Sequence, residues 1–292
     1  MGFFLKFLRC YKIEDILLNL KLSYSPKVSV TIIYTVPIFS KGDLMSVIKA
    51  VLCDIGGVLY VGDIPIKGAV EAVARIKRQF PVRFITNTTQ TRGEQLAEAL
   101  QKMGFDIEGD EIITALDVTK MYLQEHQANA YYLLTDAAKE NFSDLAFSNI
   151  DYVVVGDAQD NFSYRSLNRA FRYLHSGATL LAAAKNRYFK DADGLLSMDA
   201  GGFVQALEYA SQKEAKIIGK PSAEFYHLAC QLLECSPGEC IMIGDDIESD
   251  IGGAQAAGLQ TALVKTGKFR DQDLQTGIVA DIVIDSIADF AL

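Results

Sequence analysis

From residue 46 onward, apolar and polar positions follow the periods of strands and helices in turn. Short apolar runs rich in β-branched residues end in polar residues or glycine, as buried strands do, and the segments between them carry apolar residues at helical spacing. The strands are expected at 47–57, 81–89 and 112–114, and the helices at 66–80, 91–104 and 117–127. This strand–helix alternation predicts a parallel sheet with helices on both faces.

The same alternation continues to the end of the chain, and the middle segment has its own α/β pattern. The middle segment has expected strands at 130–136, 151–157 and 178–184 and helices at 163–177 and 201–212. The strand–helix pattern of the first segment then returns, with strands at 215–221, 240–246 and 260–267 and helices at 223–233 and 249–258. We therefore expect one doubly wound α/β core domain, 45–128 and 214–292, interrupted by an inserted α/β domain at 129–213.

Residues 1–44 do not fit this organisation. Their apolar runs are far shorter than the roughly 20 residues that a membrane span needs, so no span is expected. Charged residues, among them Lys6, Arg9 and Lys12, interrupt any signal-peptide core. We expect a poorly ordered extension, or an upstream start with Met45 as the working start; a weak organelle-targeting or amphipathic anchor segment is the alternative.

Composition narrows the class of protein. The chain has 292 residues, half of them hydrophobic, with 28 basic and 37 acidic residues and a net charge of −9. This excludes a disordered chain and argues against a nucleic-acid partner, which usually needs a basic surplus. The five cysteines include no closely spaced pair, which favours reduced thiols and a cytoplasmic protein. They are Cys10, Cys53, Cys230, Cys235 and Cys240.

Polar side chains end four of the expected strands. These chain positions are Asp54, Thr86–Asn87, Gly219–Lys220 and Asp245–Asp246. Because ligands bind at the carboxyl ends of parallel strands, we expect these side chains to converge, together with Asp250. Carboxylates crowded in this way repel one another, and a divalent cation with oxygen ligands, Mg²⁺, offsets the repulsion. The alternative is an acidic loop at a helix N-terminus, where Asp favours the dipole.

These residue types together indicate phosphate chemistry. Beside a magnesium ion, Asp54 can attack phosphorus and form an aspartyl phosphate. Thr86 and the amides around Asn87 can hold phosphoryl oxygens, and Lys220 can neutralise charge on nucleophile and phosphate. The alternatives are that Thr86 is only a turn residue and that Lys220 lies on the solvated surface. The segment 265–268 lacks the spacing of a phosphate-binding loop, and we reject it as one.

Four segments resemble the four motifs of the haloacid dehalogenase superfamily of phosphohydrolases. They are DIGGVLY (54–60), FITN (84–87), IIGKP (217–221) and GDDIESD (244–250), and the resemblance covers about 46–292. The second and third motifs are far apart, which resembles the branch with a large α/β cap inserted there (subclass IIA). The resemblance therefore implies a core domain of this superfamily with an inserted cap.

The resemblance also implies a nucleophile and a metal site. Asp54 corresponds to the nucleophile, which is also a metal ligand. The backbone carbonyl of Gly56 and the carboxylate of Asp245 would complete the protein's ligands for Mg²⁺. Asp250 would support the metal directly or through water, and Asp246 is a weaker candidate.

Substrate binding and assembly are implied in the same way. Thr86, Asn87 and Lys220 correspond to residues that bind the phosphate of a small substrate, with Thr86 and Lys220 also serving catalysis. Arg187, in the expected cap, is a candidate for substrate selection; the alternative is a polar edge turn. Capped proteins of this kind often form homodimers through the cap, and we expect the same here.

Gly56 departs from the superfamily pattern. Many of these phosphatases carry Asp at this position as general acid and base, a contribution worth about 10²–10⁴-fold in rate. Its absence predicts slow turnover of alkyl phosphate esters. Pyrophosphate and P–N bonded compounds such as phosphohistidine or phospholysine, whose leaving groups need less protonation, fit better. The alternative is a catalytically weak or inactive protein that keeps the fold for binding.

Overall fold

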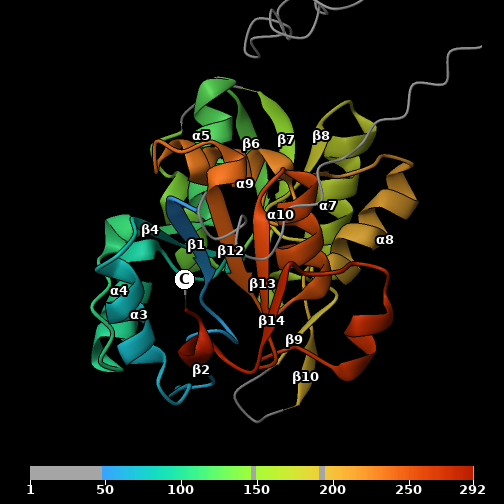
Figure 1. Cartoon of the computed structure of the whole chain (residues 1–292). Coiled ribbons are helices and arrows are strands. Elements are labelled where there is room, and N and C mark those ends of the chain that lie inside the picture. The colour runs from blue at the N-terminus through green and yellow to red at the C-terminus, as the bar shows by residue number, and fades with distance from the viewer. Residues whose placement is uncertain (1–47, 146–148, 191–194, 292) are drawn as a thin grey trace, which may run out of the picture. The chain divides into compact units, whose positions relative to one another are not determined.

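The computed structural model of the protein describes residues 48–145, 149–190 and 195–291 (Figure 1). All of them belong to the compact unit Ser40–Leu292. The expectations for residues 1–44 and for a start at Met45 lie outside the described residues. Within the described ranges, no helix has both the length and the apolar character that crossing a bilayer requires.

The core of the fold is a six-stranded parallel sheet in the order β14-β13-β12-β1-β4-β5. Its strands are β1 (Ala50–Asp54), β4 (Val82–Thr86), β5 (Ile112–Thr114), β12 (Cys240–Gly244), β13 (Gln260–Val264) and β14 (Ile282–Ile284). From β1 the sheet grows first through β4 to β5, and later through β12 to β14 on the other side. The order therefore reverses at β1, and the carboxyl end of β1 is the place where such sheets bind ligands.

Helices cover both faces of this sheet, which explains why its central strands are apolar throughout. All five residues of β1 are buried: Val51 and Cys53 belong to one apolar cluster, and Ala50 and Leu52 to another. The first cluster includes residues of α3 (Ala69–Lys77) and α4 (Gly93–Lys102), and the second includes residues of α5 (Ala115–Glu125), α9 (Ala223–Gln231) and α10 (Gly253–Ala256). This confirms the predicted doubly wound α/β core.

A second, four-stranded parallel sheet forms the inserted domain, in the order β11-β8-β7-β6. Its elements are β6 (Asn129–Leu133), α6 (Asp136–Lys139), β7 (Ile150–Val155), α7 (Tyr164–His175), β8 (Thr179–Ala182), α8 (Gly201–Ser211) and β11 (Lys216–Ile217). Val153 and Val155 pack in a cluster with α7 and α8, whereas Val154 belongs to the cluster that contains α5 and α9. The inserted sheet therefore packs against the core through one face.

Some local features differ from the expected elements. Lys216–Ile217 falls in the range that the sequence assigns to the core, but it pairs with β8 in the inserted sheet. The expected helix at 249–258 begins as a π-helical segment, Ile247–Gly252. Two short hairpins were not expected, because strands of two or three partly exposed residues give no periodicity. They are β2 (Tyr60–Val61) with β3 (Ile64–Pro65), and β9 (Tyr188–Lys190) with β10 (Leu196–Met198).

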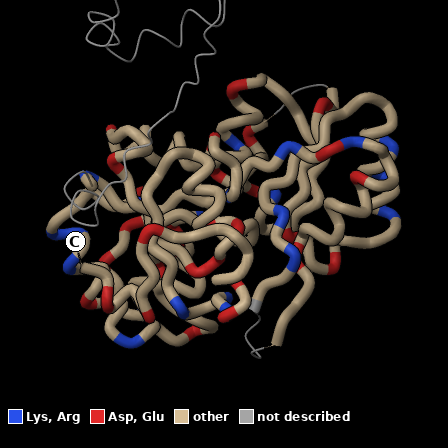
Figure 2. Tube along the Cα trace, turned by 45° about the vertical axis from the view of Figure 1, so that its right-hand side comes forward, with Lys and Arg blue, Asp and Glu red and all other residues tan. Residues whose placement is uncertain are grey.

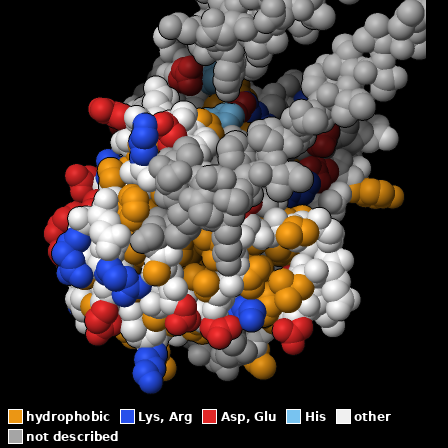
Figure 3. Space-filling model, viewed as in Figure 1, with side chains coloured by type: hydrophobic (Ala, Val, Ile, Leu, Met, Phe, Trp, Pro, Cys, Tyr) orange, Lys and Arg blue, Asp and Glu red, His pale blue; other side chains and the backbone are white. Residues whose placement is uncertain are grey.

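The described surface carries charges of both signs. Figure 2 shows acidic and basic residues interspersed along the trace of both domains. Val279 and Val283 are exposed beside and within the edge strand β14, where Figure 3 shows apolar side chains at the surface. This strand is only three residues long and is flanked by Asp281 and Asp285. Short, charged edges of this kind disfavour pairing with a second sheet.

Truncating a buried side chain of the central strand should destabilise the whole unit. Leu52 is fully buried in β1, and Leu52→Ala is expected to lower the free energy of unfolding by about 2–5 kcal/mol, because it removes buried methyl groups and leaves a cavity. Leu274, which is 50% exposed, provides the matched control, and Leu274→Ala should change stability by less than about 0.5 kcal/mol. Urea denaturation followed by circular dichroism measures both. Equal losses in the two variants would contradict this account of the core.

Candidate active site

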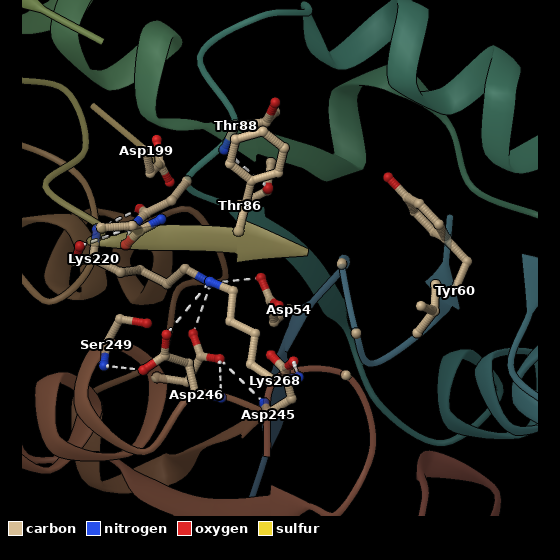
Figure 4. Close-up of a pocket in the computed structure, with 18 of the residues that line it drawn as sticks. Asp54, Tyr60, Thr86, Thr88, Asp199, Lys220, Asp245, Asp246, Ser249 and Lys268 are labelled. Carbon is tan, nitrogen blue, oxygen red and sulfur yellow. Dashed lines mark hydrogen bonds and ion pairs between the residues drawn. The ribbon is translucent and has the colours of Figure 1, made fainter. Parts of the chain in front are cut away.

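The polar strand ends predicted from the sequence line one cavity (Figure 4). Asp54 is the last residue of β1, Thr86 is the last residue of β4, and Asp245 directly follows β12. Lys220 follows β11, and Asp250 lies in the π-helical segment after β12. The cavity has a volume of about 380 Å³ and lies at the sheet edge where the strand order reverses.

The ammonium group of Lys220 joins two of these carboxylates. Its Nζ lies 2.5 Å from Oδ1 of Asp54 and 2.7 Å from Oδ1 of Asp250, and its side chain is only 3% exposed. Burial lowers the pKa of Lys220, but the charges of Asp250 and Asp54 outweigh burial and raise that pKa above its ordinary value. Lys220 is therefore held as a cation beside the proposed nucleophile.

Asp250 links this ion pair to the loop after β12. Its Oδ2 accepts hydrogen bonds from the backbone N–H groups of Asp245 (3.2 Å) and Asp246 (3.1 Å). Burial, aided by the charge of Asp54, raises the pKa of Asp250 to about 6, and the charge of Lys220 acts in the opposite direction. Because both of its oxygens are already bonded, Asp250 orients the loop as well as balancing Lys220.

The acidic cluster fits a divalent cation. Carboxylate oxygens of Asp54, Asp245 and Asp250 lie within 4.8 Å of one another, and all three residues are buried. Burial raises the pKa of Asp245 well above its usual range, and the charges of Asp54 and Asp250 add to this effect. Four aspartates, Asp54, Asp245, Asp246 and Asp250, and two lysines, Lys220 and Lys268, line this part of the cavity, so carboxyl groups outnumber ammonium groups there. Closely spaced hard oxygen donors with this charge suit Mg²⁺.

Two glycines allow Asp245 to occupy its position. A Cβ on Gly57, or on Gly267, would lie 2.0 Å from Oδ2 of Asp245. Both residues also have positive φ, 84° and 61°, which disfavours any side chain. Their backbones therefore form the wall against which this carboxylate packs. The sequence signal for Gly57 was its place within the first motif, whereas Gly267 carried none that pointed to the site.

Lys268 is a further site residue that the sequence did not single out. Its backbone N–H donates to Oδ2 of Asp245 at 2.7 Å, and its Nζ lies 3.4 Å from Oδ2 of Asp246. Burial lowers the pKa of Lys268, but the charges of Asp246 and Asp245 outweigh burial and raise that pKa. The segment 265–268, which the sequence analysis rejects as a phosphate-binding loop, contributes its last two residues to the lining of the cavity.

Asn87 holds the backbone of Lys220. Its Oδ1 accepts from the N–H of Lys220 and its Nδ2 donates to the carbonyl of Lys220, both at 2.8 Å. Nδ2 also lies 3.3 Å from Oδ1 of Asn186, in the cap. The side-chain amide of Asn87 is therefore a clamp that positions Lys220, and phosphate binding at Asn87 stays a prediction. Thr86 accepts a hydrogen bond from the N–H of Thr88 at 3.1 Å, and its hydroxyl proton remains a donor for a phosphoryl oxygen.

Arg187 lies apart from this cavity. Its guanidinium is 2.6 Å from both carboxylate oxygens of Glu248, its side chain is 72% exposed, and it lines an adjoining cavity of about 350 Å³ that shares Asp245 and Lys268 with the active-site cavity. Asn186 and Phe189, on either side of it in the chain, line the active-site cavity. A role of Arg187 in substrate binding stays a prediction, and Gly56 lines the cavity as expected of a residue that offers its carbonyl there.

Comparison with known proteins identifies the class. The haloacid dehalogenase-like hydrolase model matches residues 51–148, and a HAD-hydrolase-like model matches residues 217–290. The chain belongs to the haloacid dehalogenase-like hydrolases, as the four motifs indicated. It is 43% identical over 227 residues to Haloacid dehalogenase-like hydrolase domain-containing protein 2 from Homo sapiens, which covers 77% of this chain and 87% of that protein.

A named phosphatase is equally similar. The chain is 41% identical over 253 residues to the phospholysine phosphohistidine inorganic pyrophosphate phosphatase of Rattus norvegicus, which covers 84% of this chain and 93% of that protein. Together these relatives make the protein a phosphatase of the haloacid dehalogenase-like family.

Solved structures share its fold. NagD from E. coli K-12 superposes with a TM-score of 0.76 at 24% identity, covering 84% of this chain and 98% of that chain. The 4-nitrophenylphosphatase of Thermotoga maritima superposes with a TM-score of 0.77 at 22% identity, covering 84% and 97%. At these identities the likeness concerns the fold, and its coverage includes the inserted domain as well as the core.

Removing the Asn87 clamp should impair turnover more than substrate binding. Asn87→Ala deletes both hydrogen bonds to the Lys220 backbone, and we expect kcat to fall about 10–100-fold, the equivalent of two hydrogen bonds, with a smaller change in KM. Asn186→Ala removes the 3.3 Å contact with Asn87 and a hydrogen bond to Asp199 but keeps both bonds to the Lys220 backbone, and kcat should stay within about threefold. Steady-state kinetics, with circular dichroism to verify folding, measures both. An unchanged kcat in Asn87→Ala would refute the clamp.

Proposed function

We propose that the protein is a magnesium-dependent phosphohydrolase that acts through a phospho-aspartyl intermediate at Asp54 on a small phosphorylated substrate. The observation that carries this proposal is the contact between the Asp54 carboxylate and the buried ammonium of Lys220, inside a cavity that also holds Asp245 and Asp250. A carboxylate held in this way is a nucleophile with a fixed position and a neighbouring positive charge.

The proposed reaction has two steps. In the first, a carboxylate oxygen of Asp54 forms a bond to phosphorus while the bond to the leaving group breaks, and the electron pair departs with that group. Lys220 neutralises negative charge on the phosphoryl oxygens, and the Thr86 hydroxyl donates to one of them. A water molecule then attacks the phosphoryl group, which leaves as inorganic phosphate and restores the Asp54 carboxylate. Bound Mg²⁺ would supply further charge neutralisation at the carboxylates of Asp54 and Asp245 and the carbonyl of Gly56.

Gly56 narrows the substrates that this mechanism serves. Without a side chain here, an alkoxide leaving group receives no proton from this position. Pyrophosphate and P–N bonded compounds, phosphohistidine or phospholysine among them, have leaving groups that need less protonation. The printed name of the rat relative, which combines these substrates, supports the same choice.

A second candidate function rests on the same residue. A protein that binds a phosphorylated ligand and turns it over weakly or not at all would also tolerate Gly56. The retention of Asp54, Lys220 and the acidic cluster in contact with one another favours the enzyme, since binding alone requires no nucleophile.

The proposal also covers the cellular location, the partners and the oligomeric state of the protein. The four cysteines in the described part of the chain, Cys53, Cys230, Cys235 and Cys240, are free thiols, which supports a reducing, cytoplasmic location. The acidic net charge of −9 disfavours nucleic acid as a partner. A homodimer through the cap stays a prediction; exposed apolar side chains of the cap, such as Tyr164 and Tyr209, are compatible with it.

Removing the nucleophile should abolish turnover. Asp54→Asn is expected to reduce kcat for pyrophosphate and for phosphoramidates by at least about a thousandfold, because the amide cannot form the acyl phosphate. Omission of Mg²⁺ with added EDTA should likewise suppress the activity of the wild-type protein. Asp110→Asn, an exposed change far along the chain from the four motifs, is the control and should keep full activity. A fully active Asp54→Asn variant would refute the mechanism, and a wild type inert toward all these compounds would favour the binding protein.

Restoring a carboxyl group at position 56 should add acid catalysis. A Cβ on Gly56 meets no atom within 4 Å and the residue has no positive φ, so the backbone at position 56 accepts a side chain. Hydrolysis of alkyl phosphate esters is expected to rise by at least about tenfold, toward the 10²–10⁴-fold that a well-placed general acid–base contributes. Gly56→Asn has the same shape but exchanges no proton and should not accelerate them. Equal rates in the Asp and Asn variants would contradict the role assigned to this position.

A further inference from the structure

A phenol in the active-site cavity takes no part in the two steps proposed above. Tyr60 is the last residue of the first motif and the first residue of the short strand β2. Its half-buried side chain lines the same cavity as Asp54 and Lys220. A side chain that can donate a proton therefore stands beside the nucleophile without an assigned role.

The backbone around Tyr60 is held from two sides. The N–H of Gly57 donates to the carbonyl of Tyr60 at 2.8 Å, which folds the first motif back on itself. On the other side, Tyr60 pairs with Pro65 in the hairpin of β2 and β3. The ring is thus fixed close to position 56, where many phosphatases of this superfamily carry the Asp that serves as general acid.

The hydroxyl group of Tyr60 is available to a bound molecule. Figure 4 shows Tyr60 across the cavity from Lys220, with Asp54 between them and the hydroxyl turned toward the side that holds Thr86 and Thr88. Among the residues that the structure describes, none forms a hydrogen bond with this hydroxyl. A phenol is protonated at neutral pH and is both donor and acceptor, so its partner here has to be substrate or water.

Two carboxyl groups of the cap that line the same cavity are less suited to give up a proton. The side-chain amide of Gln90 donates to Oδ2 of Asp157, and the N–H of Ala200 donates to Oδ1 of Asp199 at 2.6 Å. Hydrogen bonds from N–H groups favour the ionised carboxylate, which has no proton to donate. The unengaged phenol is therefore the better candidate for a proton donor.

We propose that the phenol of Tyr60 donates a proton to the leaving group, and so supplies the acid that Gly56 lacks. This inference rests on the proposed phosphohydrolase function and extends it to alkyl phosphate esters. As the P–O bond breaks, its electron pair passes to the leaving oxygen, which takes the proton from Tyr60 and departs as an alcohol. In the second step, the tyrosinate accepts a proton from the attacking water, and the phenol and the Asp54 carboxylate are both restored.

The acidity of a phenol decides which leaving groups benefit from this donor. An alkoxide is a stronger base than a tyrosinate and takes the proton, whereas 4-nitrophenolate is a weaker base and departs without it. The contribution of Tyr60 therefore grows with the basicity of the leaving group. A residue that only supports the shape of the cavity would affect all leaving groups alike.

Three phosphate esters test this dependence: 4-nitrophenyl, phenyl and ethyl phosphate, in order of increasing basicity of the leaving group. Tyr60→Phe removes only the hydroxyl group, and kcat/KM includes the step in which the leaving group departs. With the full chain and Mg²⁺, we expect kcat/KM to fall about 100-fold for ethyl phosphate, by an intermediate factor for phenyl phosphate and by less than about threefold for 4-nitrophenyl phosphate. Tyr209→Phe, an 88% exposed residue that does not line the cavity, is the matched control and should leave all three values unchanged.

A second substitution tests whether the lost group is an acid. In the Tyr60→Phe background, Gly56→Asp should raise kcat/KM for ethyl phosphate by at least about tenfold, because it provides another proton donor at a position that accepts a side chain. Gly56→Asn in the same background exchanges no proton and should give no increase. Equal values in the two double variants would contradict the role assigned to Tyr60.

The outcomes distinguish this inference from the function on which it rests. If Tyr60→Phe changes kcat/KM for all three esters by the same factor, or for none of them, Tyr60 is not the donor, while the phosphohydrolase stands. A wild type that cleaves 4-nitrophenyl phosphate without detectable cleavage of ethyl phosphate would also overturn the inference alone. If the wild type cleaves none of the esters, nor pyrophosphate or a phosphoramidate, the proposed function fails and the inference fails with it.

Discussion

The buried ammonium group of Lys220, between Asp54 and Asp250, is the interaction on which the site depends. A buried ion is costly unless it is paired and hydrogen-bonded, and here all three groups satisfy one another. The pairing joins the ends of β1 and β11 to the π-helical segment after β12, three segments far apart in the sequence. Loss of Lys220 would leave two buried carboxylates without their cation, and loss of Asp250 would free the loop that carries Asp245.

The position of Lys220 also depends on the cap. Residues just before it continue the edge of the inserted sheet: the N–H of Ile218 donates to the carbonyl of Ala182 at 2.9 Å, and that of Gly219 to the carbonyl of Ala183 at 3.0 Å. On the core side, the amide of Asn87 holds the Lys220 backbone. The lysine is therefore fixed from both domains, so a displacement of the cap would act directly on the group that neutralises the phosphate.

The sequence predicted the parts of the site that depend on periodicity. Strand patterns ending in Asp54, Thr86 and Asp245 placed these residues at one sheet edge, because parallel strands share that edge. It did not predict roles that arise from contacts between distant segments, such as the clamp made by Asn87. In the cap it singled out Arg187, although Phe189 lines the cavity, because β9 begins only at Tyr188 and so short a strand gives no pattern that places its side chains.

The open space around Gly56 has a consequence for how such an enzyme can change. Gly57 and Gly267 are fixed by their contact with Asp245, so a new side chain at either position would dismantle the acidic cluster. Gly56 is free of that constraint. Two of the four glycine codons become aspartate codons by a single nucleotide change, so one point mutation can place a carboxyl group at this position. The fold thus separates the evolution of reaction chemistry from the maintenance of stability.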